Sequence, residues 1–410
     1  MMTGSPSVGR LLDRAPMDRP VALLLRHSVR DDLPPGEAGN RVPITEIGRK
    51  LATELGARIG KRLCTLHASP LIRCVQTAEG LRRGAGIDIQ IIRDRLLGDP
   101  GVFVIDGQRA WTNWENLGHE AVMHHLVNSD DALPGMARPD PAARFLVHHM
   151  LSTAGDQPGL HIFITHDSLV TATAARLLSA PLGPGDWPWY LEGAFFWRTE
   201  GGIQTAYRDL DNIHTPRALC TLDETDIIEF ARREIAATVG VDSGARFFLA
   251  GGAFKTLLTG HPPRDLDLWA PSARDRTALI AALESRGASR LAVRPFADAF
   301  KIADRVVEVP HKVEPATLDE RLSRFDIALS AIGVEHRPDD LWSAQIHPLA
   351  QASVQARQVI LLKPLINKKF AMATLERTQR YSKELGYEIP AEEKAEVYRT
   401  CDDWARTPLP

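Results

Sequence analysis

Two apolar runs in the sequence each end in a histidine. Residues 21–25 lead directly into Arg26 and His27, and residues 160–165 lead into His166. Both runs have the length and composition of buried strands in a parallel sheet. Ligands of open α/β sheets bind just beyond the carboxyl ends of the strands, so both histidines are expected at one binding edge. A strand that ends in solvated charge is the simpler explanation for either run taken alone.

Several cationic side chains accompany these histidines. Arg26 precedes His27, Arg30 follows it closely, and Arg73 stands near the start of a predicted helix. Together they suit an anionic group, most simply a phosphate. One imidazole would attack phosphorus in line, the arginines would hold the non-bridging oxygens, and a nearby acid such as Asp167 would protonate the leaving alcohol. The set predicts phosphoryl transfer through a covalent phosphohistidine, with no cofactor at this site.

A second group of chemically competent residues lies in the C-terminal half. An apolar strand pattern ends in Gly251 and Gly252, and Asp265 and Asp267 follow a short loop later. Paired glycines let backbone amides approach a phosphate closely at the start of a helix. Carboxylates two residues apart on a strand point to one face, and carboxylate oxygens are ligands that Mg²⁺ takes. The spacing therefore predicts a magnesium site beside a triphosphate cradle.

The elements that must position these residues follow an α/β pattern in two domains. The first twenty residues mix Gly, Ser, Pro and Arg and predict a flexible arm, and residues 209–221 are turn-rich and predict the domain boundary. The predicted domains are 21–210 and 222–410. Residues 98–142 predict an irregular insertion that shapes a pocket rim. The other elements expected in the first domain are strands near 64–67 and 87–92 and helices starting at about 45, 70, 145 and 169.

The N-terminal motifs resemble those of the histidine phosphatase superfamily, also called phosphoglycerate-mutase-like. The resemblance implies a three-layer α/β/α fold with His27 as the nucleophile. It also implies that Arg26, Arg73 and His166 complete the phosphate pocket, with Arg30 as a further ligand. The matching segments occur in the family's order, cover roughly residues 20–200, and are residues 26–30, 44–48, 69–79 and 165–167.

Two features depart from this family pattern. Ser28 stands where the family usually has a glycine after the nucleophilic histidine. The proton donor is open between two residues. Asp167 follows the second histidine, as in the acid-phosphatase branch, and is favoured, whereas Asp99 lies near the position of the acid in the mutase branch. Nothing in the chain resembles the longer mutase-specific segments, so a mutase is not favoured.

The tryptophans of this half receive two different interpretations. Trp187 and Trp189 are flanked by prolines and are expected to pack the edge of the sheet. Trp111 and Trp114 belong to the predicted insertion on the side of the site, so they are the expected substrate contacts. The adjacent histidine pairs at 124–125 and 148–149 are not expected to hold a metal, because neighbouring side chains diverge on a helix.

The C-terminal motifs resemble the nucleotidyltransferase superfamily of DNA polymerase β, most closely the head domain of CCA-adding enzymes and bacterial poly(A) polymerases. The resemblance implies an α+β fold with a small mixed sheet and an NTP as substrate. It implies that Asp265, Asp267 and Glu308 are the catalytic carboxylates and hold Mg²⁺. The supporting elements are a helix at about 227–236, a strand at 247–250, a hairpin at 300–309 and a helix at about 374–389.

Further positions in this half match the family less closely. The resemblance implies that Gly251, Gly252, Lys255 and Arg324 bind the nucleotide. Lys255 stands where the family usually has Arg-Asp, and the segment 324–331 keeps only the Arg and Asp of its motif. The long helical body that grips tRNA in the family has no counterpart, and a net charge of −3 gives no global attraction to a polyanion. An RNA end is therefore a possible but disfavoured partner.

The sequence as a whole predicts a cytoplasmic bifunctional enzyme. No apolar run reaches membrane-spanning length, the first twenty residues lack the core of a signal peptide, and the four cysteines have no metal or disulfide spacing. The primary reading is a phosphomonoesterase fused to a Mg²⁺-dependent nucleotidyltransferase that modifies a hydroxyl acceptor. The alternatives are a phosphatase with an inactive, nucleotide-sensing C-terminal domain and an RNA-end repair protein. The acceptor, the preferred NTP and the oligomeric state stay open.

Overall fold

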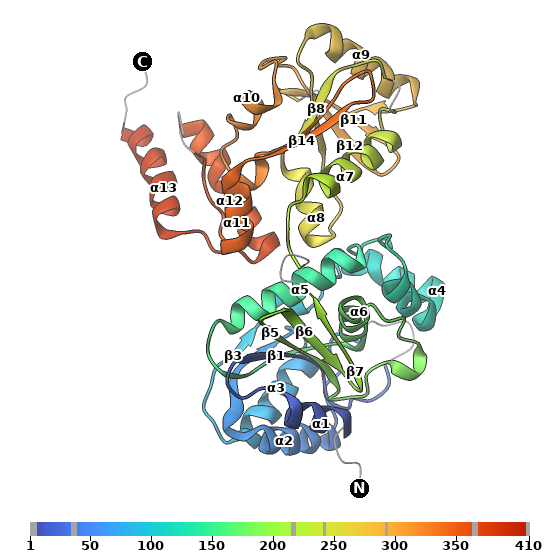
Figure 1. Cartoon of the computed structure of the whole chain (residues 1–410), viewed down its shortest axis with the longest axis vertical. Helices are drawn as coiled ribbons and strands as arrows, with labels where there is room; N and C mark the ends of the chain where they lie inside the picture. The colour runs from blue at the N-terminus through green and yellow to red at the C-terminus, as the bar shows by residue number, and fades with distance from the viewer. Residues whose placement is uncertain are drawn as a thin grey trace. The chain divides into compact units, whose positions relative to one another are not determined.

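The computed structural model describes residues 6–33, 39–214, 219–240, 243–291, 294–362 and 368–406. The chain divides into two compact units, Met1–Cys220 with Thr259–His261 and Thr221–Leu258 with Pro262–Pro410. Each unit is built on a seven-stranded sheet of its own (Figure 1). The predicted fold class, two mixed α/β domains, is confirmed. No helix among the described residues is both long enough and apolar enough to cross a membrane.

The strand that carries Arg26 lies in the middle of the first sheet. This strand, β1 (Pro20–Arg26), pairs in parallel with β4 (Gly159–Thr165) and antiparallel with β5 (Gly193–Thr199). Its five central residues are fully buried, as the continuous apolar run requires. The sheet order is β3-β2-β4-β1-β5-β6-β7, where the remaining strands are β2 (Leu63–Ala68), β3 (Ile91–Arg93), β6 (Gly202–Tyr207) and β7 (Leu210–His214).

Helices cover both faces of this sheet and complete three layers (Figure 1). One hydrophobic core joins the alternate β1 residues Val21, Leu23 and Leu25 to three helices, and the opposite face receives two further helices. Residues of one face alternate along a strand, which is why both layers can bury against β1. The helices of the first core are α1 (Pro6–Arg14), α2 (Glu46–Ile59) and α3 (Ile72–Ala85); α5 (Pro139–Ala154) and α6 (Asp167–Leu178) cover the other face.

Three predictions for this unit need correction. Residues 6–14 of the expected flexible arm form α1, because Val8, Leu11 and Leu12 have helical spacing and bury against the sheet. The expected irregular insertion consists largely of α4 (Gly107–Asn128), which Asp106 caps and which kinks at Gly118. Finally, β7 extends the sheet beyond residue 210, the predicted end of the domain, by pairing with β6. These stretches contain glycine, proline and other turn-forming residues, so their composition predicts loops rather than helices or a strand.

The second unit has a mixed sheet in which β9 (Leu266–Trp269) is central. β9 pairs in parallel with β12 (Arg305–Pro310) and antiparallel with β8 (Phe247–Ala250), and the predicted hairpin is present as β11 (Ala297–Ile302) and β12. The sheet order is β10-β11-β12-β9-β8-β13-β14. The other elements are α7 (Glu224–Ala237), α8 (Thr256–Thr259), α9 (Ala273–Ser285), β10 (Ser289–Arg290), α10 (Leu318–Leu322), β13 (Ile332–His336), β14 (Trp342–Ile346), α11 (Pro348–Ala356), α12 (Lys368–Leu385) and α13 (Ala391–Arg406).

Candidate functional site

His27 lies directly after β1 and is buried, with 3% of its surface exposed. Its Nδ1 is 2.8 Å from the carbonyl oxygen of Ser28. Because a carbonyl oxygen only accepts, Nδ1 carries the proton in the neutral ring and Nε2 carries the lone pair. Burial above all, and then the charges of Arg73 and Arg26, lowers the pKa of His27 to about 3. The imidazole is therefore neutral at physiological pH and keeps a lone pair on Nε2.

The arginines beside His27 keep part of their hydrogen-bonding capacity unused. Arg26 donates from Nη1 to the carbonyl oxygen of Pro188 at 2.6 Å, and Arg73 donates from Nη1 to a backbone carbonyl at 2.8 Å. The Nε atoms of Arg26, Arg30 and Arg73, all buried, have no hydrogen-bond partner among the described residues. Buried donors are normally satisfied, and orphaned ones need an explanation. An anion with several acceptor oxygens would satisfy them.

His166 completes this group from the end of β4. Its ring centroid is 5.5 Å from that of His27, in an edge-on arrangement, and its Nε2 is 3.4 Å from Ser69 Oγ. The other ring nitrogen, Nδ1, is buried without a partner within the described part of the chain. Burial, followed by the charges of Arg73 and His27, lowers the pKa of His166 well below its ordinary value. A second neutral imidazole thus faces the same space.

The two candidate proton donors differ in their electrostatics. Asp167 Oδ2 is 2.9 Å from Arg26 Nη2; burial opposes ionisation of this carboxyl, but Arg26 and His119 outweigh it and lower the pKa. Asp99 has a raised pKa because of partial burial and, second, the nearby charge of Asp106. The preceding residues place Asp99 close to the end of β4, since Thr165 Oγ1 donates to the Leu97 carbonyl oxygen at 2.8 Å. The pKa values of the two carboxyls are thus shifted in opposite directions, down for Asp167 and up for Asp99.

Ser28, in place of the family's glycine, fits because helix α2 receives it. Its Oγ donates to the carbonyl oxygen of Gly48 at 2.7 Å, and its backbone N–H donates to Thr77 Oγ1 at 2.9 Å. Gly48 itself allows the close approach, because a Cβ there would lie 2.3 Å from the carbonyl oxygen of Val29. The serine is thus part of the frame around His27, and the departure does not disturb the site.

The structure brings together every residue predicted for the phosphate site. Charge interactions link His27 to Arg26, Arg73 and Asp167, link Arg73 to Arg30, and link His166 to the same group. Residues 23–188 match the histidine phosphatase superfamily, branch 1. The histidine phosphatase domain therefore has its motif residues in one place, at the carboxyl ends of β1 and β4, as an open α/β sheet predicts.

Sequence reasoning missed an aromatic residue of the histidine phosphatase domain. The Arg26 guanidinium lies over the ring of Tyr190, 4.2 Å from its centroid, and that ring is 5.7 Å from the ring of His27. Trp189 does not pack the sheet edge as expected: 71% of its surface is exposed. Trp111, the expected substrate contact, donates its indole N–H to Glu115 on its own helix at 2.9 Å. The loop before β5 has no periodicity that could have marked Tyr190.

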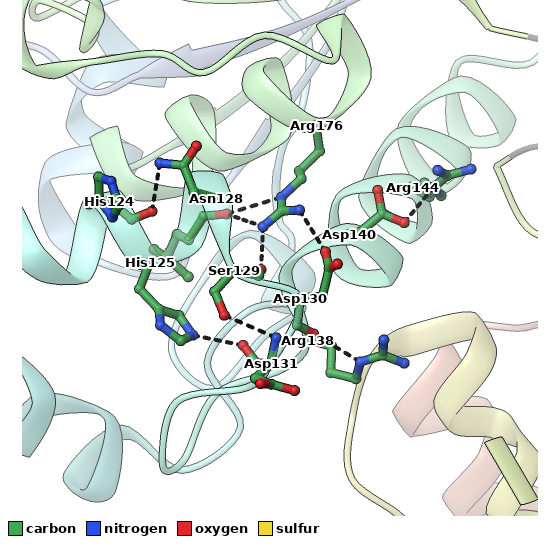
Figure 2. A network of polar contacts seen from close by, with 11 residues as sticks. His124, His125, Asn128, Ser129, Asp130, Asp131, Arg138, Asp140, Arg144 and Arg176 are labelled. Carbon is green, nitrogen blue, oxygen red and sulfur yellow. Dashed lines mark hydrogen bonds and ion pairs between the residues drawn. The ribbon is translucent and has the colours of Figure 1, made fainter. Parts of the chain in front are cut away.

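Helix α4, which carries His119 near Asp167, is tied to α6 by an arginine (Figure 2). Arg176 of α6 donates to the carbonyl oxygens of Leu126 and Ser129 at the end of α4 and pairs with Asp130 at 3.0 Å. Arginine is suited to this role because it presents several donors in a fixed plane. The contacts fix the end of α4 against the helix that begins at Asp167.

In the second unit, two of the predicted carboxylates are neighbours across strands. Glu308 of β12 is in register with Asp267 of β9, and Asp265 comes just before the same strand. Burial, then the charges of Asp265 and Glu308, raises the pKa of Asp267 to about 7. Like charges close together in a buried place disfavour ionisation, and here this effect exceeds the opposing charges of Arg264 and Arg294.

Two arginines form ion pairs with carboxylates of this acidic cluster. Arg264 lies 2.9 Å from Asp265 Oδ2, and Arg294 pairs with Glu308. No group of three or more His, Cys, Asp or Glu side chains within the described ranges is arranged to hold a metal ion. The donor set of Asp265, Asp267 and Glu308 nonetheless has the oxygen chemistry of Mg²⁺ ligands. The three carboxylates therefore suit Mg²⁺ chemically, and in this structure Asp265 and Glu308 are paired with arginines.

The predicted nucleotide-binding residues differ in how close they lie to the carboxylates. Gly251, with φ 126°, lies close to Asp267, whose Oδ2 would be 3.1 Å from a Cβ at that glycine. Lys255 is turned to α12, where it pairs with Glu384 and lies 3.7 Å from the centroid of the Tyr381 ring. Gly252 also faces Tyr381 closely. Arg324, in contrast, is exposed. The turn at Gly251 is thus next to Asp267, whereas Lys255 contacts helix α12.

Solved structures resemble the C-terminal half at low sequence identity. A tRNA nucleotidyltransferase complexed with a primer tRNA and an ATP analogue is 19% identical over 38% of this chain and 47% of that one, with a TM-score of 0.32. The Thermotoga maritima CCA-adding enzyme complexed with tRNA is 13% identical over 45% of this chain and 43% of that one, with a TM-score of 0.35. The chain spans less than half of each structure. No curated protein matches it.

Proposed function

We propose that the N-terminal domain hydrolyses phosphomonoesters through a covalent phosphohistidine on His27. The observation that carries this proposal is a set of buried nitrogens around a neutral imidazole, belonging to Arg26, Arg30, Arg73 and His166, that have no hydrogen-bond partner in the described part of the chain. A phosphate monoester offers several acceptor oxygens to these donors and a phosphorus atom to the nucleophile. Positive charge held in place before the reaction also stabilises the charge that develops in the transition state.

The reaction proceeds in two balanced steps. The Nε2 lone pair of His27 attacks phosphorus, the N–P bond forms, and the bond between phosphorus and the ester oxygen breaks. The leaving alkoxide takes a proton from a carboxylic acid and departs as the alcohol. Water then attacks the phosphohistidine and gives a proton to the carboxylate left by the first step. The N–P bond breaks, and inorganic phosphate leaves with the imidazole and the carboxylic acid both restored.

Either Asp167 or Asp99 supplies the proton to the leaving group. The contact with Arg26 supports Asp167 by its position beside the phosphate-binding arginines, whereas the raised pKa of Asp99 supports Asp99 by favouring the protonated form that a donor needs. Loss of a general acid slows esters of poor leaving groups more than esters of good ones. Asp167→Asn and Asp99→Asn are compared on glycerol 3-phosphate and p-nitrophenyl phosphate. The true donor is the residue whose loss lowers kcat for the glycerol ester much more than for the nitrophenyl ester.

Trapping of the phosphoenzyme tests the proposal directly. The full chain is mixed with a ³²P-labelled monoester and quenched in alkali, which preserves phosphohistidine. His27→Ala should abolish both the label and turnover, while His124→Ala, an exposed histidine of α4, should retain both. Turnover that persists in His27→Ala, with no labelled protein in the parent enzyme, would overturn the covalent mechanism.

A second function, nucleotidyl transfer from an NTP to a hydroxyl acceptor, is favoured by the acidic cluster. The raised pKa of Asp267, which is buried beside Asp265 and Glu308, supports a cation site there. These three residues would hold Mg²⁺, which when bound supplies positive charge for the triphosphate. The chain's own residues bind and orient: because Gly251 has no side chain, the backbone of this turn comes close to Asp267.

We propose a small molecule or an RNA end as the acceptor of this transfer. We also propose that the reaction takes place in the cytoplasm. Incubation with each α-³²P-labelled NTP, Mg²⁺ and pooled metabolites or RNA should transfer label in the parent protein and not in the double variant Asp265→Asn with Asp267→Asn. Binding of NTP without transfer, unchanged in the double variant, would favour a nucleotide sensor. Label that appears on RNA and falls with rising salt would identify an RNA end.

A further inference from the structure

The loop before β5 borders the phosphate site on one side. The carbonyl oxygen of Pro188 accepts from Arg26 at 2.6 Å, and the ring of Tyr190 lies 4.2 Å from the Arg26 guanidinium. Tyr190 is also 5.7 Å from the ring of His27. The residues on both sides of Trp189 therefore contact Arg26, one of the groups that would hold a phosphate, so the backbone of Trp189 lies next to the site.

The backbone of Trp189 is held by two hydrogen bonds, whereas most of the residue is exposed. Its N–H donates to Glu192 Oε2 at 2.8 Å, and its carbonyl oxygen accepts from the Glu192 N–H at 3.0 Å. Glu192 is buried and is held in turn by two hydrogen bonds from Arg208. With 71% of the residue exposed, a large planar ring is presented to solvent from a rigid turn. Such a ring is normally at least half buried in a folded protein.

Two more rings lie beside the same site. The ring centroids of His119 on α4 and Trp187 are 5.3 Å apart in an edge-on arrangement. His119 acts electrostatically on Asp167, which pairs with Arg26, so His119 lies near that ion pair. We name the four residues His119, Trp187, Trp189 and Tyr190 the aromatic collar.

We propose that the aromatic collar binds a planar aromatic ring carried by the alcohol part of the substrate, with Trp189 as the residue that determines this specificity. The substrate class is then a phosphomonoester of a ring-bearing alcohol, of which a nucleoside 5′-monophosphate is the natural example. In-line attack by His27 requires the leaving alcohol to lie on the opposite side of phosphorus from the histidine. The alcohol therefore extends out of the buried pocket, past residues at its edge. The inference rests on the proposed phosphatase function.

Two substrates with matched reactivity test the collar. Adenosine 5′-monophosphate and glycerol 3-phosphate both release a primary alcohol, and only the first carries an aromatic ring. In Trp189→Ala, the ratio of kcat/KM for the adenosine ester to that for the glycerol ester should fall about tenfold, the order expected for the loss of one base–indole stack. Trp189→Phe should recover most of the ratio, because it keeps a ring. Trp111→Ala is the matched control and should leave the ratio unchanged, since its indole is bonded within α4.

Equilibrium binding separates failure of the collar from failure of the phosphatase. In a His27→Ala background no phosphohistidine forms, and calorimetry should still detect adenosine 5′-monophosphate binding that Trp189→Ala weakens about tenfold. An unchanged kcat/KM ratio together with unchanged binding in Trp189→Ala would overturn the collar even if the enzyme is an active phosphatase. Tryptophan-dependent binding without any turnover in the parent protein would instead support the collar and contradict the proposed hydrolysis.

Discussion

The buried carboxyl of Asp267 provides a quantitative test of the acidic cluster. Its pKa rises from an ordinary value of 3.8 to about 7, chiefly by burial and then by the charges of Asp265 and Glu308. One pKa unit corresponds to about 1.4 kcal/mol. Holding Asp267 ionised in the native protein therefore costs about 4 kcal/mol of the free energy of unfolding once the pH exceeds both values.

The sign of this effect depends on pH. Below about pH 4 the carboxyl is protonated in both states and costs nothing. Between about pH 4 and pH 7 the native state binds more protons than the unfolded state, so stability falls as the pH rises. Asp267→Asn removes the charge at nearly constant size. We expect it to stabilise this unit by up to about 4 kcal/mol near pH 8 and by almost nothing near pH 4.

Urea unfolding in EDTA, followed by hydrogen exchange of peptides from β9 and β12, measures this unit separately from the other one. Asp304→Asn is the matched control, because Asp304 is an exposed aspartate of the same sheet that pairs with Arg305. It should change the free energy of unfolding by less than about 1 kcal/mol at either pH. A gain in Asp267→Asn of equal size near pH 4 and pH 8 would refute the charge explanation.

Three further outcomes are expected. Because the pKa of His27 is about 3, the rate of phosphoenzyme formation in rapid quench should show no loss of the nucleophile near pH 6.5; an inflection there that His27 controls would contradict the neutral ring. Gly48→Ala, whose Cβ would lie 2.3 Å from a carbonyl oxygen, should destabilise the first unit by about 1–3 kcal/mol in thermal unfolding, while Gly185→Ala, with open space, should not. Lys255→Met should lower the free energy of unfolding by about 1 kcal/mol, because its ion pair with Glu384 is lost. If the same substitution lowers it equally in the Glu384→Gln background, the ion pair contributes nothing to stability.

The two histidines of the first unit could be predicted because each directly follows a buried strand. The apolar runs before His27 and His166 identify β1 and β4, and a parallel sheet then places their carboxyl ends together. The histidine predictions need only local periodicity and a general rule of sheet topology, both of which a single sequence contains. Glu308 is expected from the family resemblance alone, and the register of β12 with β9 places it beside Asp267.

The contacts that tune these residues could not be predicted in the same way. Tyr190 reaches Arg26 from a loop more than 160 residues away, and no periodicity marks that loop. Arg294 pairs with Glu308 because β11 and β12 bring them together, which depends on side-chain geometry in the folded chain. Helix α1 is different, because its apolar spacing is present in the sequence. The glycines and prolines in and around it are typical of a loop and oppose that signal.

Burial moves the key pKa values of the two sites in opposite directions, and this difference has a functional consequence. Burial and arginine charges lower the pKa of His27 to about 3, so its lone pair is available throughout the physiological range while the arginines keep their charge for a phosphate. Burial and carboxylate charges raise the pKa of Asp267 to about 7, so that site is fully ionised at neutral pH only when a cation compensates it. We therefore expect the phosphatase site to be competent before its ligand arrives and the acidic site to be completed by its cation. At low Mg²⁺ the second activity should rise steeply through about pH 7, while the first follows its proton donor.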